Sequence, residues 1–243
     1  MFNFISNNQL INQSIRRMLQ KKITKEVFDF LKQLELNNNR DWFNEHKKQF
    51  TALNDGVNQV FTAVYEKMKQ HDEIEKLKFF RIYRDVRFSR NKAPYKTNLG
   101  ASMSRAGSNR RGGYYMHIQS GASFIATGFW NPEKEDLFRI RKEWEVDATE
   151  LRAIINKKKF KEIWGDLAGE ALKTAPKGFD KEHSNIDLIR RKQFIFVNNF
   201  TDKEVMAIDF VETLNDAFKA IRPFFDLMSN VLTTNLNGES IIK

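Results

Sequence analysis

Residues 113–130 read GYYMHIQSGASFIATGFW, and this stretch decides the fold class. Two runs rich in aromatic and β-branched residues, at 114–119 and 122–130, stand on either side of Gly121. Runs of this composition favour strands, and a glycine between two of them is typical of a β-hairpin. We therefore expect an antiparallel sheet that contains this hairpin.

Two further segments outside the hairpin predict strands. FFRIYRDVRF at 79–88 is rich in aromatic and β-branched residues, and QFIFVNNF at 193–200 has the same character. Between 79–88 and the hairpin, the stretch from Ser89 to Arg111 has no regular strand or helix period, and we interpret it as a loop. The sheet should therefore have about four strands or more.

Helical patterns precede the strands. TKEVFDFLKQL at 24–34 places its apolar residues at i, i+3, i+4 and i+7, which is one buried helical stripe, with Thr24 at the N-cap. A longer helix should follow Asn37–Asn39 and run to about Met68. Together these two predict an N-terminal helical hairpin.

Helical patterns also follow the hairpin. They cover 133–155 and 160–172, and a further helix should open at the capping box that begins at Thr201. Pro223 should kink that helix or start a new one. The fold class is therefore α+β: an antiparallel sheet flanked by N-terminal and C-terminal helices.

The chain divides into three parts on this reading. Residues 18–234 form a single domain, because no linker or internal repeat interrupts them. Residues 1–17 are rich in Asn and Gln, and we expect a poorly ordered leader or an extension. Residues 235–243 form a polar tail.

The net charge of +10 is concentrated in one segment. Residues 76–112 contain eleven Lys or Arg and one acid, Asp85, so the remainder of the chain is balanced. A localised excess points to a site for an anionic ligand, whereas an even spread would favour nonspecific binding to polyanions.

Strand alternation in 80–88 would separate the charged from the apolar side chains, with Arg84 as the exception. One face would carry Arg81, Tyr83, Asp85 and Arg87, and the other Phe80, Ile82, Val86 and Phe88. The strand at 114–119 divides in the same way, and we infer that these two strands pair.

The candidate site residues follow from this arrangement. The anion-binding candidates are the cations and tyrosines of the segment: Arg81, Arg84, Arg87, Arg90, Lys92, Tyr95, Lys96, Tyr83 and Tyr115. The catalytic candidates are His117, as a general acid or base, and Asp85, which can orient an arginine. Each has a structural alternative: a salt-bridge ladder with an acid such as Asp187, a solvated loop, or a hydrogen-bonded strand histidine.

Several blocks of the sequence resemble a bacterial family, the domain of unknown function numbered 2461. The longest is FRIYRDVRFSRNKAPYKTNLGA at 80–101. Other blocks stand in the same order as in the family: NNNRDWF at 37–43, GYYMHIQSGASF at 113–124, PKGF at 176–179 and IDLIRRKQF at 186–194. The resemblance covers about 19–232 and implies a fold and candidate positions, and no reaction. It also makes Met18 a plausible start. The chain departs from the family at Ser184 and at Ala126–Thr127.

Features that the sequence lacks exclude several classes of protein. The chain has no cysteine, which removes disulfides, thiolate nucleophiles and iron–sulfur clusters, and we identify no metal-ligand motif. Walker, Rossmann, nucleophile-elbow and zincin motifs are also missing. Without a signal peptide or an apolar run of roughly 18–20 residues, we expect a cytoplasmic protein with no membrane partner.

Three functions fit the basic, aromatic segment. The first is a pocket for a phosphorylated or carboxylated small molecule, with or without catalysis. The alternative is a nucleic-acid-binding module that uses the same surface, and the third is a docking site for an acidic protein. The sequence leaves the cofactor, the substrate and the oligomeric state open.

Overall fold

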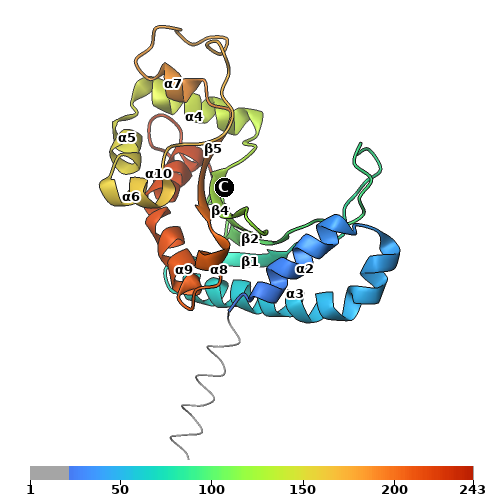
Figure 1. Cartoon of the computed structure of the whole chain (residues 1–243). Coiled ribbons are helices and arrows are strands. Elements are labelled where there is room, and N and C mark those ends of the chain that lie inside the picture. Colours follow the sequence, from blue (N-terminus) through green and yellow to red (C-terminus); the bar gives the residue numbers. More distant parts are fainter. Residues whose placement is uncertain (1–21, 243) are drawn as a thin grey trace, which may run out of the picture.

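The computed structural model describes residues 22–242, and Figure 1 shows their arrangement. The predictions for residues 1–17 lie outside this range. Five strands form one sheet in the order β1-β2-β3-β4-β5, and every neighbouring pair is antiparallel. The strands are β1 (Ile74–Phe79), β2 (Leu99–Arg105), β3 (Gly113–Ile118), β4 (Ser123–Phe129) and β5 (Phe194–Phe200).

Helices flank this sheet on both the N-terminal and the C-terminal side of the sequence, so the α+β class is confirmed. Before the sheet come α2 (Lys25–Leu36) and α3 (Arg40–Met68). After β4 come α4 (Lys134–Val146), α5 (Thr149–Ile155), α6 (Lys158–Trp164), α7 (Ile186–Ile189), α8 (Asp202–Val205), α9 (Phe210–Ala220) and α10 (Arg222–Thr233). The description of 18–234 as one domain stays a prediction.

The N-terminal helical hairpin forms as its pattern predicts. The stripe of α2 that includes Phe30 and Leu34 is buried. Asn39 caps α3, because its side-chain oxygen accepts a hydrogen bond from the Trp42 amide at 3.0 Å. Thr24 stands at the N-cap of α2 without a side-chain capping bond.

The core lies between one face of the sheet and helices α3, α9 and α10 (Figure 1). Residues of β3 alternate between buried and half-buried, so one face of the strand packs against the helices. Tyr114 on that face contacts Phe218 of α9 and Phe225 of α10 edge to face, with ring centroids 5.0 and 5.1 Å apart. The side chains that alternate with Tyr114 point to the opposite face, which carries the candidate site.

The strand predicted at 79–88 is wrong in position. β1 ends at Phe79, and residues 80–98 instead form a long connection to β2, called the arm below. The predicted apolar face is covered only in part: Ile82 is buried and Phe80 and Val86 are half-buried, whereas Phe88 is 97% exposed. Alternation along the chain cannot show whether the rest of the protein packs against a segment and buries its apolar face.

Strand β2 was missed, and the inferred pairing was therefore wrong. We expected 79–88 to pair with 114–119, whereas β2 lies between β1 and β3. Its sequence LGASMSR consists largely of small residues, which have weak strand propensity. Both faces of β2 are buried at Leu99, Gly100 and Ala101, and small side chains fit in this confined space.

Two helix predictions differ in extent. The helix predicted over 160–172 ends at Trp164, followed by Gly165 with a positive φ of 62°. The capping box at Thr201 is present, but α8 is one short turn before a separate α9. Pro223 stands in the first turn of a new helix, α10, as expected. No helix within residues 22–242 combines the length and apolarity that a membrane span requires.

Candidate ligand-binding site

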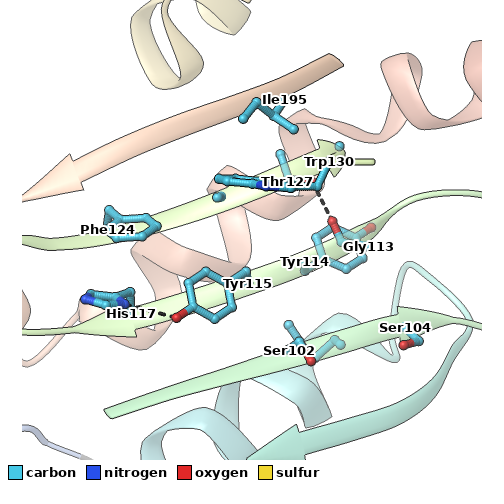
Figure 2. Close-up of a pocket in the computed structure, with 13 residues that line it drawn as sticks. Ser102, Ser104, Gly113, Tyr114, Tyr115, His117, Phe124, Thr127, Trp130 and Ile195 are labelled. Carbon is cyan, nitrogen blue, oxygen red and sulfur yellow. Dashed lines mark hydrogen bonds between the residues drawn. The ribbon is translucent and has the colours of Figure 1, made fainter. Parts of the chain in front are cut away.

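A cavity of about 580 Å³ lies over the sheet face that points away from the core helices. Its lining comes from β2, β3, β4, the start of β5 and the residue after β4. The side chains that shape it are Ser102, Ser104, Tyr115, His117, Phe124 and Trp130 (Figure 2). The cavity therefore combines aromatic walls with a few polar groups.

Strand register brings these side chains together. Tyr115 lies opposite Ser102 on one side and Ala126 on the other, and His117 lies opposite Phe124. Cross-strand partners share a face, so the three aromatic rings form one patch over two neighbouring strands (Figure 2). The small Ala126 leaves room above the sheet beside them.

Gly128 fits where a larger residue could not. Its φ is +120°, and a Cβ atom there would lie 2.2 Å from the carbonyl oxygen of Phe194 on β5. A side chain at this position would push β4 away from β5. The glycine therefore permits the close pairing that shapes this end of the cavity.

His117 is held in one orientation by four neighbours. Its Nε2 lies 2.8 Å from Gln119 Oε1, and its Nδ1 lies 3.0 Å from Tyr115 Oη. Its ring stacks on Phe124, with centroids 4.5 Å apart and an angle of 18°. The amide nitrogen of Asn98 lies 3.3 Å from Nδ1, so this arrangement places the proton on Nε2 and leaves Nδ1 as an acceptor.

Burial shifts the pKa of both groups in this pair so that each favours its neutral form. It lowers the pKa of His117 below its usual value, with the Gln119 hydrogen bond opposing the shift in part. Burial also raises the pKa of the Tyr115 hydroxyl. At neutral pH the pair therefore consists of a neutral imidazole and a neutral phenol.

The Tyr115 hydroxyl occupies space that Gly100 provides. A Cβ atom on Gly100 would lie 3.0 Å from Tyr115 Oη. Because β2 has no side chain at this position, the hydroxyl can reach the imidazole of His117. The glycine thus positions the donor of the pair.

The turn between β3 and β4 fixes Gln119. The Gln119 amide donates to Ser123 Oγ at 3.1 Å, and Ser123 Oγ donates back to the Gln119 carbonyl at 2.8 Å. The next residues of the turn, Ser120 and Gly121, both donate to the Asp202 carboxylate at the start of α8. The second partner of His117 is therefore anchored to a helix.

Lysines stand beside the cavity along β1. Lys76 and Lys78 lie opposite Ser104 and Ser102, so their side chains belong to the cavity face. The ammonium groups of Lys78 and Lys96 lie 5.5 and 5.4 Å from the ring centre of Phe80. Within residues 22–242, none of these three lysines forms an ion pair.

Phe80 connects this row of lysines to the cavity. Its ring lies 5.9 Å from that of Tyr115, edge to face. An anion beside the lysines would therefore lie next to the aromatic patch.

The structure separates the candidate residues of the sequence into two groups. His117 and Tyr115 line the cavity, and Lys96 stands at its edge above Phe80. The other candidates lie on the arm, outside the cavity lining: Arg81, Tyr83, Arg84, Asp85, Arg87, Arg90, Lys92 and Tyr95.

Four of the arm candidates have side-chain partners within the arm: Arg84, Asp85, Arg87 and Lys92, whose Nζ donates to the Val86 carbonyl. Asp85 and Arg87 form an exposed ion pair at 2.6 Å, which lowers the pKa of the Asp85 carboxyl. Arg84 donates to the Ala93 carbonyl and to Ser89 Oγ.

Tyr95 and Asp187 do not lie where the sequence predicted them. Tyr95 is buried, and its ring stacks on Phe43 at 4.0 Å. Asp187, considered as an acid partner for the basic segment, instead pairs with Arg152.

Sequence reasoning missed the β1 and β2 contributions to the site. Ser102 and Ser104 alternate with buried Ala101 and Met103, and this period of two was the available signal. The Gly and Ser content of the segment concealed it. Lys78 was counted only in the charge balance, because the position of β1 depends on contacts distant in sequence.

The fold and the cavity define a class: an α+β protein whose antiparallel sheet packs on helices with one face and carries a ligand-sized cavity on the other. Residues 26–227 match the family described as conserved hypothetical protein (DUF2461), and the protein belongs to this family. This confirms the resemblance seen in the sequence blocks. Searches of curated proteins and of solved structures found no match.

Proposed function

We propose that the protein binds a small anionic molecule, phosphorylated or carboxylated, in the cavity on the sheet face. The observation that carries this proposal is the shared face of the aromatic cavity and the β1 lysines, joined through Phe80. The planar, apolar part of the ligand lies against the rings, and its anionic group lies beside the ammonium groups.

The size and lining of the cavity support the apolar part of this ligand. A volume of about 580 Å³ lies within the usual range for small-molecule sites, which are mostly apolar with few polar groups. Tyr115, Phe124 and Trp130 offer flat surfaces, and Trp130 is 55% exposed at the cavity wall. Ser102 and Ser104 supply hydroxyl groups that orient a ligand by hydrogen bonds.

Unpaired lysines support the anionic part. Lys76, Lys78 and Lys96 carry three charges that no acid neutralises within the described residues. A competing explanation is that lysines on an edge strand prevent pairing with another sheet. This explanation does not account for Lys96, because Lys96 lies on the arm rather than on the edge strand β1 and its ammonium group lies over the Phe80 ring.

The Tyr115–His117 pair supports a ligand that exchanges a proton. The neutral imidazole can accept the tyrosine proton at Nδ1 while the tyrosine oxygen takes a proton from the ligand. Both groups point into the cavity, where burial keeps them neutral until a ligand arrives. Binding is the proposed function, and this pair adds the means for proton transfer.

Thermal shift with matched probes tests the proposal. Phenyl phosphate, benzoate and adenosine monophosphate are compared with phenol, benzyl alcohol and adenosine. The anionic probes should raise the melting temperature more than their neutral counterparts, because a ligand that binds only the folded state stabilises it. Lys78→Ala should weaken the binding of anionic probes about two- to fivefold, as expected for a partly exposed charge.

Lys159→Ala is the matched control, since Lys159 is exposed on α6 and does not line the cavity. It removes the same charge and should leave binding unchanged. Equal responses to anionic and neutral probes, or equal losses in the two lysine variants, would refute the proposal.

A further inference from the structure

The arm, residues 80–98, projects from the sheet as an extension of β1 and β2. Backbone hydrogen bonds join its two sides, from the Arg84 amide to the Pro94 carbonyl at 2.9 Å and from the Lys96 amide to the Ile82 carbonyl at 2.7 Å. In Figure 1 its far end stands apart from the helices and the sheet. The arm is therefore a hairpin rather than an irregular loop.

Its base is fixed to the N-terminal helices. The Asn38 side chain donates to the Tyr95 carbonyl at 3.0 Å and accepts from the Tyr95 amide at 3.1 Å. Tyr95 stacks on Phe43 of α3, and Ile82 is buried. These contacts set the direction of the arm relative to the sheet.

Its tip, residues 85–93, is folded by its own charged side chains. Lys92 Nζ donates to the Val86 carbonyl at 3.1 Å, and Arg84 donates to the Ala93 carbonyl at 3.2 Å. Asp85 pairs with Arg87, as described above. Part of the basic character of the tip thus serves to hold its shape.

This shape presents Phe88 to the solvent. The residue is 97% exposed at the end of the arm, between the exposed Arg87 and the exposed Arg90. Single exposed apolar residues are common on protein surfaces. Here, however, two cations and a salt bridge organise the backbone on either side of the ring, which argues for a role of the ring itself.

The charge of the arm indicates the kind of partner. It carries six Lys or Arg and one acid, Asp85. Arg81 and Arg90 have no acid partner in the part of the chain that the structure describes. A polyanion with flat apolar groups matches both the cations and the single aromatic ring.

We infer that the arm binds single-stranded nucleic acid, with Phe88 stacked on a base and Arg90 at a neighbouring phosphate. Stacking on an aromatic ring and charge contacts to phosphates are the two contributions that sequence-tolerant single-strand binding uses. An anionic bilayer fits less well, because the residues beside Phe88 are Arg87 and Ser89 rather than apolar. The inference goes beyond the proposed pocket function, since no residue of the tip lines the cavity.

Fluorescence anisotropy with a labelled oligo(dT) and an oligo(U) of twenty nucleotides tests this inference on the full chain. Phe88→Ala should weaken binding about tenfold, while Phe88→Trp keeps the affinity, because an aromatic face is retained. Phe88→Leu should behave like Phe88→Ala. Arg90→Ala should lower the slope of log affinity against log salt concentration by about 0.7, the value for one phosphate contact on a single strand.

Phe138→Ala is the matched control, since Phe138 is 54% exposed on α4 and does not belong to the arm. It should bind both oligonucleotides like the unchanged protein. Circular dichroism and the melting temperature show that each variant is folded, which we expect because Phe88 makes little contact with the core.

Three results would overturn the inference. One is no binding of either oligonucleotide at low salt. Another is equal affinity of the unchanged protein, Phe88→Ala and Phe138→Ala. The third is a blue shift of Phe88→Trp fluorescence on phosphatidylserine vesicles without one on the oligonucleotides, which would assign the tip to a membrane. None of these bears on the thermal-shift test of the cavity, so the two proposals fail separately.

Discussion

His117 shows how a single side chain links the cavity to the stability of the fold. Its imidazole is kept neutral by burial, which the hydrogen bond to Gln119 opposes in part. Its pKa in the folded state therefore lies below the usual value near 6.5. In the unfolded chain the same side chain takes up a proton at higher pH.

This difference predicts a pH-dependent stability. As pH falls from about 6.5, the unfolded state binds a proton before the folded state, so the free energy of unfolding decreases. The contribution is fully present above the unfolded pKa and is lost as pH falls through the folded pKa. Urea unfolding between pH 5 and 7.5 should show a smaller pH slope in His117→Gln than in the unchanged protein. An NMR titration in which His117 titrates at or above 6.5 would contradict this.

Gly100 allows the hydroxyl of Tyr115 to reach His117, and the contact can be tested by a double-mutant cycle. Gly100→Ala places a methyl group 3.0 Å from Tyr115 Oη and should reduce the free energy of unfolding by about 1–3 kcal/mol. Tyr115→Phe removes the oxygen, so the added cost of Gly100→Ala should be smaller in that background. Strictly additive effects in urea unfolding would show that the hydroxyl is elsewhere.

At the scale of elements, the turn between α2 and α3 determines where the arm begins. Asn38 makes both hydrogen bonds to the backbone of Tyr95 that a neighbouring strand would make. A residue 57 positions earlier in the sequence thus replaces a strand partner for the arm. The family blocks at 37–43 and 80–101 therefore meet in space.

Removal of the Asn38 side chain should loosen the base of the arm. Asn38→Ala loses two hydrogen bonds and should reduce the free energy of unfolding by roughly 1–3 kcal/mol. Hydrogen exchange should accelerate at Tyr95 and Lys96 more than in the hairpin of β3 and β4. Asn37→Ala is the control, because the Asn37 side chain donates to the Gln33 carbonyl at the end of α2 and has no bond to the arm. Unchanged exchange at Tyr95 in the Asn38 variant would show that the stack on Phe43 alone fixes the arm.

At the scale of the whole molecule, the basic segment divides into charges used by the fold and charges left on the surface. Arg105 is buried, and its Nε donates to the buried Asp72 at 2.9 Å. Tyr114 Oη donates to the same carboxylate at 2.5 Å, and Arg222 lies 3.2 Å from it. Burial and the Asp72 charge raise the pKa of Tyr114, so its hydroxyl keeps its proton.

This buried network predicts unequal effects for arginines that look alike in the sequence. Arg105→Met leaves the Asp72 carboxylate short of its main partner inside the protein and should cost about 3–5 kcal/mol of unfolding free energy. Arg110→Ala breaks a partly exposed pair with Glu73 and should cost about 1 kcal/mol or less. Urea unfolding of both variants measures the difference. Similar costs would mean that Asp72 is not sealed from water.

Local patterns predicted the elements whose own residues have a strong period or a strong propensity. The hairpin around Gly121 follows from two short apolar runs on either side of a glycine, and the strand predicted at 193–200 forms as β5. The candidate site was predicted in part for the same reason. Tyr115 and His117 share a face of one strand, so alternation alone places both on it.

Features that depend on distant partners could not be predicted in this way. Strand β2 lacks strong propensity and forms because β1 and β3 satisfy its backbone hydrogen bonds. The segment 80–88 has strong propensity and becomes one side of a projecting arm, because the body of the protein covers only its base. Propensity is a weak preference that tertiary contacts override.

The amino-acid sequence by itself determined the α+β class, the family and the concentration of positive charge in residues 76–112. Tertiary structure alone decided which of those charges remain free, where the cavity lies and that Phe88 faces solvent. Composition and periodicity depend on neighbours along the chain. The pairing of a charge and the covering of a ring depend on segments that meet only when the chain has folded.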